Sequence, residues 1–354
     1  MIHTTGWGAT VPGGPLEPMD VPRRDPGPGD VVIDILYCGV CHTDIHQVDD
    51  DWGNSHYPMV PGHEIVGRVR EVRSGSGDLA PGDLVGVGCM VGSCGDCPSC
   101  SEGLEQYCAR GPVLTYNSKD PATGQITLGG YSGTIVVSEG FVLPLPEGLD
   151  PAGTAPLLCA GITVYSPLRR HGAGPGTRVG VIGIGGLGHL GLRMASALGA
   201  ETVAITSSPD KRDDALRLGA NDVLVSTDRE AMERWSGGFD LLLSTIGTPH
   251  DLNPYLELLR RDGTYALMGS LGPTPPVVGV LLAGRRAALT SSMFGGIAET
   301  REMLDFCARH GITAEVETVP VERIGEAFAR TAAKKARYRF VLDLTSARGN
   351  AGAP

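Results

Sequence analysis

RVGVIGIGGLG, residues 178–188, decides the fold. A short apolar strand, 178–182, runs directly into glycines spaced Gly-x-Gly-x-x-Gly, and apolar residues then recur at helical spacing up to position 198. This order of strand, glycine turn and helix is the context in which the pattern binds a dinucleotide, because the helix N-terminus then faces the pyrophosphate. The alternative is an ordinary glycine-rich loop. The expected contact residues are Gly183, Gly185, Gly186, Leu187 and Gly188.

Strands and helical stretches alternate on the C-terminal side of this loop. Short apolar strands are expected over 202–206, 223–225, 240–243 and 265–268, with a helix over 210–218. Such alternation indicates a parallel, doubly wound sheet.

The regions on either side of this alternating segment differ from it. Residues 1–155 read mainly as β structure: 31–36 is a short apolar run, and 65–72 alternates with period two. After about residue 296 the pattern predicts one helix over 299–310 and a final strand over 338–343. The sequence therefore predicts an α/β protein in which a mainly-β domain accompanies a doubly wound Rossmann domain.

Composition and charge exclude several classes of function. The chain has 354 residues, with 41% hydrophobic and 19% charged, which is typical of a globular protein of about two domains. Its net charge is −11, and Lys and Arg form no patch, so we expect no nucleic-acid or membrane partner. With no apolar run of about 18 residues and no signal-peptide pattern, the nine cysteines indicate metal binding in a reducing cytoplasm rather than disulfides.

Four of the cysteines, Cys94, Cys97, Cys100 and Cys108, lie within 15 residues. Four thiolates at this spacing complete a tetrahedral Zn²⁺ shell and leave no open position, so the site would be structural. The alternatives are an iron–sulfur cluster or free surface thiols. The preference of zinc for four cysteines in a tetrahedral shell favours zinc.

Three further residues, Cys41, His63 and Cys159, are candidates for a second metal site. Each is weak alone, because a lone cysteine is more often a core residue and a lone histidine more often a surface or hydrogen-bonded residue. Together, two thiolates and one imidazole leave a fourth position for water or substrate, as a catalytic zinc requires.

Several segments in the same order carry a family resemblance. They are GVCHTD (39–44), YPMVPGHE (57–64), the four-cysteine run with LEQYC (104–108), APLLCAGIT (155–163) and RYRFV (337–341). The chain resembles the zinc-dependent medium-chain alcohol dehydrogenases and reductases. Within them it is similar to the cinnamyl-alcohol-dehydrogenase-like branch, which includes bacterial NADPH-dependent aldehyde reductases.

This resemblance implies a domain organisation. A GroES-like catalytic domain would comprise residues 1–158 completed by 297–354 and would hold both zinc sites. A Rossmann domain over 159–296 would bind NADP(H). The resemblance also implies a homodimer.

The resemblance further implies roles for single residues. Cys41, His63 and Cys159 would bind the catalytic zinc, Glu64 would lie beside it as a transient ligand, and Asp44 would accept the other ring N–H of His63. A proton relay would run from Thr43 through the nicotinamide ribose to His46 and solvent. His42 would contact the pyrophosphate, and Thr163 the nicotinamide side. The alternative for His46 is an exposed loop histidine. Three cysteines are left over and are interpreted as core thiols: Cys38, Cys89 and Cys307.

The strand after the glycine loop indicates the cofactor. An NAD enzyme usually places Asp or Glu at its end to hold the ribose 2′-OH, but this strand ends in Thr206 and Ser207. Small hydroxyls at Ser207 and Ser208 leave room for a 2′-phosphate, which Lys211 and Arg212 would neutralise. The alternative is that both cations belong to a solvated helix face. The pattern favours NADP(H).

Candidate pocket residues come from the resemblance alone: Trp52, Leu114, Met293 and Phe294. Plant members tend to carry a large Trp about where Leu114 stands, so a cinnamyl aldehyde is not singled out as substrate. An apolar pocket suits aromatic or medium aliphatic aldehydes.

These observations predict a zinc- and NADP(H)-dependent alcohol dehydrogenase or aldehyde reductase. The intact ligand trio argues against a zinc-free quinone or enoyl reductase. Two alternatives stay open: a zinc-dependent reductase of a biosynthetic imine, iminium or ketone, and a non-enzymatic zinc-stabilised NADPH sensor.

Overall fold

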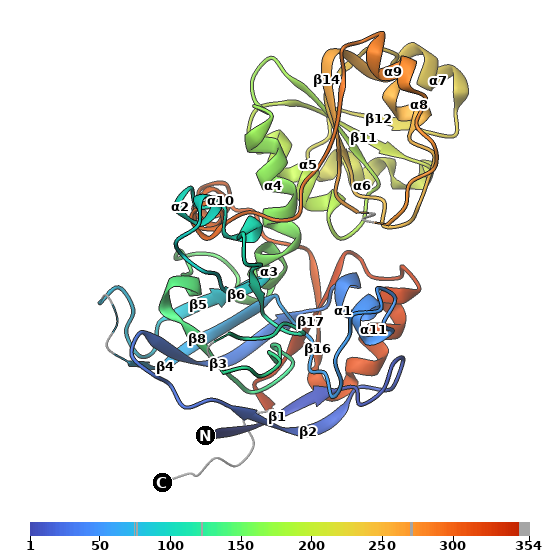
Figure 1. The fold of residues 1–354 in the computed structure, drawn as a ribbon. Helices are drawn as coiled ribbons and strands as arrows, with labels where there is room; N and C mark the ends of the chain where they lie inside the picture. Colours follow the sequence, from blue (N-terminus) through green and yellow to red (C-terminus); the bar gives the residue numbers. More distant parts are fainter. Residues whose placement is uncertain (74, 76, 122, 270–271, 347–354) are drawn as a thin grey trace. The chain divides into compact units, whose positions relative to one another are not determined.

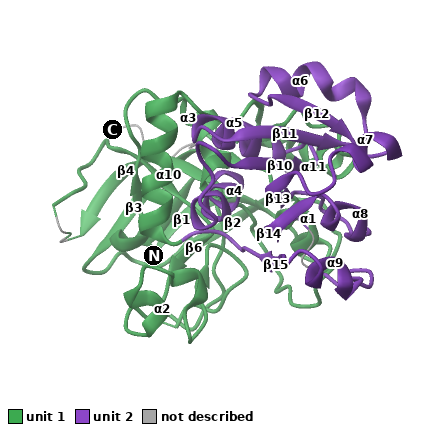
Figure 2. Cartoon of the chain, turned by 90° about the horizontal axis from the view of Figure 1, so that it is seen from above, with its two compact units in different colours: residues 1–159, 296–354 green, residues 160–295 purple. Residues whose placement is uncertain are grey.

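The computed structural model describes residues 1–73, 75, 77–121, 123–269 and 272–346. The chain divides into two compact units (Figure 2). Unit 1 comprises Met1–Cys159 and Gly296–Pro354, and unit 2 comprises Ala160–Gly295. No described helix is long and apolar enough to cross a membrane.

Unit 2 is built on a parallel sheet (Figure 1). Among its described residues, six strands lie in the order β12-β11-β10-β13-β14-β15, and each neighbouring pair is parallel. This is the order 3-2-1-4-5-6 of a dinucleotide-binding sheet. The strands are β10 (Arg178–Ile182), β11 (Glu201–Thr206), β12 (Asp222–Val225), β13 (Phe239–Ser244), β14 (Leu259–Leu267) and β15 (Ala288–Ser291).

Helices connect and cover these strands. They are α4 (Ala160–Arg170), α5 (Gly188–Ala197), α6 (Arg212–Arg217), α7 (Arg229–Arg234), α8 (Asn253–Leu256) and α9 (Gly279–Ala283). After Arg178 the central strand β10 is apolar and buried, because parallel sheets are covered on both faces. Gly180 has no room for a side chain, since a Cβ there would lie 2.5 Å from Leu242 Cδ2 on β13. Burial on both faces of the sheet therefore accounts for the apolar residues of β10, and the close approach of β13 accounts for Gly180.

Unit 1 contains a larger, mainly antiparallel sheet. Its described strands follow the order β16-β17-β3-β4-β5-β9, and β8 also pairs with β3. Two ribbons, β1-β2 and β6-β7, stand apart from it. The strands are β1 (Ile2–Gly8), β2 (Glu17–Arg23), β3 (Asp30–Gly39), β4 (Ile65–Arg73), β5 (Leu84–Val87), β6 (Met90–Gly92), β7 (Val113–Leu114), β8 (Thr134–Ser138), β9 (Leu143–Pro144), β16 (Val316–Pro320) and β17 (Arg339–Asp343).

Five α-helices accompany this sheet within the described residues. The α-helices are α1 (His42–Val48), α2 (Pro98–Ser101), α3 (Pro151–Thr154), α10 (Ile297–His310) and α11 (Ile324–Ala332). Several 3₁₀ turns are also present, of which η1 (Glu105–Tyr107), η3 (Ala155–Leu158) and η4 (Pro209–Lys211) matter below. The core of unit 1 is formed by fully buried residues of β3 and β4, such as Ile33, Ile35 and Ile65.

The predicted fold class is confirmed: a mainly-β unit accompanies a doubly wound parallel sheet. The segment after residue 296 was predicted incompletely, because it also contains β16 and α11. In β16 only Val319 is buried, so the strand lies at the edge of the sheet and lacks a clear alternating pattern. Helix α11 has only nine residues, which is short for recognition by periodicity.

Candidate active site

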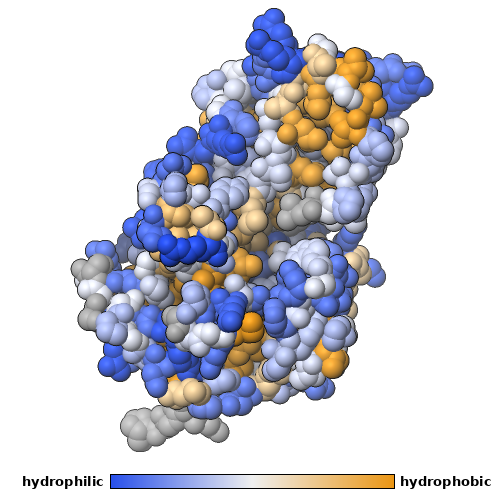
Figure 3. All heavy atoms as spheres, in the orientation of Figure 1, coloured by the Kyte–Doolittle hydropathy of each residue, from blue (hydrophilic) through white to orange (hydrophobic). Residues whose placement is uncertain are grey.

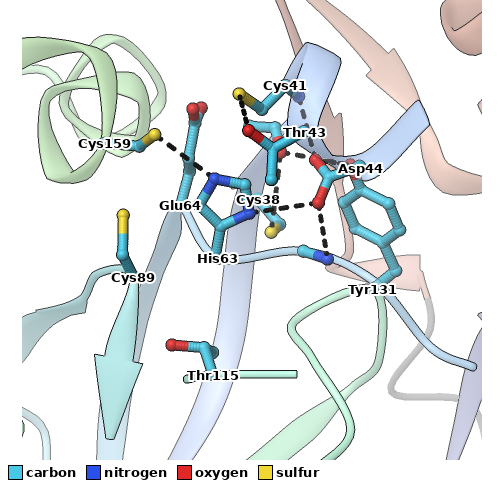
Figure 4. A network of polar contacts seen from close by, with 12 residues as sticks. Cys38, Cys41, Thr43, Asp44, His63, Glu64, Cys89, Thr115, Tyr131 and Cys159 are labelled. Atoms are coloured by element: carbon cyan, nitrogen blue, oxygen red, sulfur yellow. Dashed lines mark hydrogen bonds and ion pairs between the residues drawn. The ribbon is translucent and has the colours of Figure 1, made fainter. Parts of the chain in front are cut away.

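The first metal-binding candidate lies within unit 1, where three separate segments meet (Figure 4). Cys41 directly precedes α1, His63 precedes β4, and Cys159 follows η3. Their ligand atoms and a carboxylate oxygen of Glu64 all lie within 4.8 Å of one another. The Nε2 atom of His63 is 3.3 Å from the sulfur of Cys159.

The donor atoms fit a tetrahedral zinc. With bonds of about 2.1 Å to nitrogen and 2.3 Å to sulfur, a zinc ion separates these two donors by roughly 3.6 Å, close to the distance between His63 Nε2 and Cys159 Sγ. The pKa of the Cys41 thiol is lowered well below its usual range, chiefly by a hydrogen bond from Cys159. Two sulfurs in mutual contact both become thiolates when a cation lies between them. The three residues therefore have the chemistry of an open zinc site.

Asp44 fixes the orientation of the histidine. Its side chain is fully buried, and its Oδ1 atom lies 3.1 Å from His63 Nδ1. The backbone N–H groups of Cys41 and Gly62 also donate to this carboxylate, at 2.9 and 3.2 Å. His63 therefore carries its proton on Nδ1 and presents Nε2 toward the cysteine sulfurs.

Two buried residues at the site were not predicted from the sequence. Tyr131 donates a hydrogen bond from its hydroxyl to Asp44 Oδ2 at 2.7 Å. Arg339, the first residue of β17, forms an ion pair with Glu64, and both side chains are almost completely buried. The sequence does contain a feature that could have drawn attention to each residue. Gly129-Gly130 directly precedes Tyr131, and Arg339 lies in the family segment 337–341.

Glu64 lies beside the sulfur ligands without being fully paired. Burial raises the pKa of its carboxyl to about 7, and the neighbouring Arg339 opposes this shift. Its Oε2 atom is buried and has no hydrogen-bond partner within the described part of the chain. A Cβ on Gly39 would lie 1.9 Å from that oxygen, so only glycine leaves room for it. Glu64 therefore offers a free carboxylate oxygen at the metal-binding cluster.

The two relay candidates lie on α1. The hydroxyl oxygen of Thr43 is 3.6 Å from the sulfur of Cys41, and His46 follows one helical turn later. His46 is partly exposed, and its Nδ1 lies 2.7 Å from a carboxylate oxygen of Asp51. The ring of Trp52 is 5.3 Å from that of His46. His42, at the start of the same helix, is exposed.

The remaining cysteines do not share one environment. Cys38 and Cys307 are fully buried in the core, as expected. The prediction for Cys89 was wrong, because this residue is only partly buried. Its sulfur points toward Cys159 (Figure 4). Hydrogen bonds with Cys41 and, next in size, with Cys89 raise the pKa of the Cys159 thiol. Its position directly before β6 brings it beside the site, a placement that sequence spacing alone does not reveal.

The second metal-binding candidate is the loop between β6 and β7. The sulfurs of Cys94, Cys97, Cys100 and Cys108 all lie within 4.8 Å of one another. Two of these separations are 3.5 Å (Cys97 to Cys100) and 3.9 Å (Cys94 to Cys100). A tetrahedral zinc with bonds of about 2.3 Å separates its sulfurs by roughly 3.8 Å. The loop therefore has the geometry of a closed, four-sulfur zinc site.

The glycine loop lies in unit 2 between β10 and α5. Gly183 has a φ of +88°, and a Cβ on Gly188 would lie 1.9 Å from the carbonyl oxygen of Gly183, so both positions require glycine. A Cβ on Gly185 would meet nothing within 4 Å, which leaves open space above the loop. Gly186 and Leu187 complete the turn, and Leu187 is the N-cap of α5. This arrangement fits a pyrophosphate at the helix N-terminus.

The predicted cations for the 2′-phosphate have different surroundings. The amine of Lys211 donates to the carbonyl of Ile184 at 2.9 Å, so its charge lies at the glycine loop. Arg212 instead pairs with Asp222 at 3.3 Å. Ser207 is exposed and Ser208 half-buried at the end of β11. The structure thus brings Lys211 to the loop and gives Arg212 another partner.

The predicted pocket residues are divided between the two units. Trp52 and Leu114 belong to unit 1, whereas Met293, Phe294 and the nicotinamide-side candidate Thr163 belong to unit 2. The hydroxyl of Thr163 donates to the carbonyl of Met293 at 3.2 Å. Trp52 and Met293 are 47% and 45% exposed, so both offer apolar surface to a ligand.

Comparisons with known proteins agree with this fold. Residues 27–147 match the alcohol dehydrogenase GroES-like domain, and residues 186–309 match the zinc-binding dehydrogenase family. The chain is 51% identical over 333 residues to an aldehyde reductase, YahK, of Escherichia coli, covering 93% of this chain and 95% of that protein. It is 49% identical to the NADP-dependent alcohol dehydrogenase C of Mycobacterium bovis, covering 94% and 96%.

A solved structure is also similar. CAD from Helicobacter pylori, complexed with NADP(H), superposes with a TM-score of 0.90 at 37% identity and covers 97% of this chain and 98% of that one. Fold and site together define an oxidoreductase with a GroES-like unit and a Rossmann unit. The chain belongs to the zinc-binding dehydrogenase family, and the predicted resemblance is confirmed.

Proposed function

We propose that the protein interconverts aldehydes and primary alcohols by hydride transfer with NADP(H), mainly as a reductase of aromatic or medium aliphatic aldehydes. The observation that carries the proposal is the convergence of Cys41, His63 and Cys159, with the hydroxyl of Thr43 3.6 Å from the Cys41 sulfur. Two thiolates and one imidazole leave a coordination position for a substrate oxygen. The names of the E. coli and M. bovis relatives point to the same chemistry.

Several residues of unit 1 would have separate roles in aldehyde reduction. Cys41, His63 and Cys159 would hold a zinc ion, which would supply a Lewis acid for the substrate carbonyl, and NADPH would supply the hydride. Thr43 donates a proton to the product oxygen. His46 lies on the same side of α1 and restores that proton from solvent. Because Asp51 holds its Nδ1, His46 exchanges protons through Nε2.

The preference for NADP(H) rests on charge in unit 2. No carboxylate stands at the end of β11, in Thr206, Ser207 or Ser208, where an NAD enzyme would hold the ribose 2′-OH. Ser207 and Ser208 leave space for a phosphate, and Lys211 places a cation at the glycine loop. With zinc at the four-cysteine loop as well, the active protein would hold two zinc ions and one NADP(H) per chain.

A homodimer and a cytoplasmic location belong to the same proposal. Strand β15 is the outermost described strand of its sheet, and an unpaired strand edge favours pairing with another copy. Exposed apolar residues lie near it, namely Val278, Val280 and Leu289, and Figure 3 shows apolar surface gathered in the area of α9. None of the nine cysteines, all of which lie in the described part of the chain, forms a disulfide, which suits the reducing cytoplasm.

A panel of aldehydes and alcohols, assayed with NADPH and with NADH, tests the proposed activity. We expect aldehyde reduction with NADPH, loss of turnover on zinc removal, and recovery when zinc is restored. Turnover that survives complete zinc removal, or reduction of imines without any reduction of aldehydes, would overturn the proposal.

A further inference from the structure

The carboxylate of Asp44 accepts four hydrogen bonds. Besides His63, its donors are the backbone N–H groups of Cys41 and Gly62 and the hydroxyl of Tyr131. Asp44 itself has no exposed surface. The bond from Tyr131 is the shortest of the four, at 2.7 Å. Removing one hydrogen-bond donor from a buried carboxylate destabilises the folded protein, because no water takes the place of the missing donor.

The backbone of Tyr131 also holds the loop that carries His63. Gly129 N–H donates to the carbonyl of Val60 at 2.6 Å, Gly130 N–H to that of Gly62 at 2.8 Å, and Tyr131 N–H to that of Pro61 at 3.0 Å. Residues 60–62 immediately precede the histidine. The segment 129–131 therefore contacts the histidine loop through its backbone and Asp44 through its side chain.

The ring of Tyr131 is fixed in place. It is fully buried and packs edge-on against Phe328 of α11, with the centroids 6.0 Å apart. It also lies against Gly62, whose φ is +102° and whose Cβ, if present, would be 2.7 Å from the ring. The ring has no space to rotate its hydroxyl elsewhere. The other nearby acceptor, the carbonyl of Gly39, is 3.4 Å from the hydroxyl and is uncharged. The Tyr131 hydroxyl therefore donates its hydrogen bond to the Asp44 carboxylate.

From this geometry we propose that Tyr131 is a positioning residue for the catalytic zinc, acting through the chain Tyr131–Asp44–His63. The inference rests on the proposed zinc site and adds a residue that does not touch the metal. The tyrosine hydroxyl sets the position of the Asp44 carboxylate, which in turn sets the direction in which His63 presents Nε2. Removing that hydroxyl leaves the ligands in place but lets the imidazole tilt.

Tyr131→Phe removes the hydroxyl alone, and Tyr57→Phe is a matched control. The Tyr57 hydroxyl also bonds in unit 1, but to the backbone carbonyl of Val48 at 2.7 Å, at the end of α1. Zinc release to a chelator is followed from the holoenzyme, with the four-cysteine zinc as an internal reference. Outer partners of metal ligands change metal affinity by roughly 10- to 100-fold. We expect the catalytic zinc of Tyr131→Phe to leave about tenfold faster, with the structural zinc and the control variant unchanged.

Two further measurements distinguish a role of Tyr131 in positioning His63 from a role in packing alone. Cobalt in place of the catalytic zinc should show an altered visible spectrum in Tyr131→Phe and a parental one in Tyr57→Phe. Adding Tyr131→Phe to Asp44→Asn should accelerate zinc release no further than Asp44→Asn alone, because the two residues act in series. Parental release and spectrum in Tyr131→Phe, or additive effects in the double variant, would overturn the inference. A parent protein with only one zinc would instead refute the proposed function.

Discussion

Arg339 and Glu64 form an ion pair that is almost completely buried, and they lie 275 positions apart in the chain. Arg339 begins β17 and Glu64 directly follows the zinc-ligand candidate His63. Because β17 lies beside β3 in the sheet, the pair ties the C-terminal part of unit 1 to its metal-binding cluster.

Removing one partner of this ion pair should destabilise the protein more than replacing both partners by apolar residues. Arg339→Leu leaves the Glu64 carboxylate buried without a counter-charge, which typically costs about 3–5 kcal/mol of unfolding free energy. Arg339→Leu combined with Glu64→Leu should recover most of that loss, because neither charge remains. Urea unfolding of the parent, both single variants and the double variant measures this. A double variant less stable than either single variant would contradict it.

The hydroxyl of Thr43 should be required for turnover. Thr43→Val keeps the size of the side chain but removes the proton donor beside Cys41, so we expect roughly 10²- to 10⁴-fold slower reduction. Zinc content and NADPH binding should remain parental. Single-turnover kinetics at saturating cofactor make the comparison, and near-parental rates of chemistry would count against a role in proton transfer.

His46 should matter less than Thr43, because water partly replaces a terminal relay group. His46→Ala should slow turnover and alter the pH–rate profile, with partial recovery in imidazole buffer. A His46→Ala enzyme with the parental pH–rate profile would refute the relay.

Lys211 and Arg212 should differ in their effect on cofactor choice. Lys211 lies at the glycine loop, whereas Arg212 already pairs with Asp222. Losing a hydrogen bond to a charged group costs about 1.5–3 kcal/mol, or roughly 10- to 150-fold. We therefore expect Lys211→Ala to weaken NADPH binding within that range and leave NADH binding nearly unchanged. Arg212→Ala is the matched control, and equal losses in the two variants would argue against the assignment.

Adding a negative charge at Ser207 tests the same site from the opposite direction. Ser207→Asp should repel a 2′-phosphate and offer a carboxylate to a free 2′-OH, so cofactor preference should move toward NADH. The ratio of kcat/KM values for NADPH and NADH is the measurement. An unchanged ratio would show that the phosphate does not bind beside β11.

The four-cysteine loop should have one unusually reactive thiol when zinc is absent. Hydrogen bonds from the backbone N–H groups of Ala109 and Cys100 lower the pKa of Cys97 to about 6, whereas the pKa of Cys94 is raised. For an acid with a lowered folded pKa, the stabilising thiolate is fully present above the ordinary value near 9 and is lost as the pH falls through about 6.

Zinc-depleted protein at pH 7 should therefore be alkylated at Cys97 before Cys94. Labelling at Cys97 should slow as the pH drops through about 6, the value to which its pKa is lowered. Mass spectrometry of peptides after brief iodoacetamide treatment resolves the two sites. Earlier labelling of Cys94 would contradict the expected order.

Short sequence patterns correctly predicted those strands and turns whose own residues specify their conformation. The stretch 178–182 and the glycines after it form β10 and the loop before α5, because a buried parallel strand and a tight turn each have strong local requirements. The edge strand β16 and the short helix α11 carry weaker local patterns and were missed.

The partners of the site residues could not be predicted in the same way. Tyr131 and Asp44 are 87 positions apart, and nothing in their local segments specifies the bond between them. The same holds for Arg339 and Glu64 and for Cys89 beside Cys159. These contacts arise from the pairing of β3, β4 and β17 and from the loops between them, which long-range packing determines.

Zinc content and turnover, measured on the same preparations of the parent and of Cys159→Ala, test the central claim most directly. The parent should contain two zinc ions per chain and reduce an aldehyde with NADPH, because two separate donor clusters are present among the described residues. Cys159→Ala should retain one zinc ion and bind NADPH, but should have lost turnover. A variant that keeps parental turnover with one zinc ion would contradict the account.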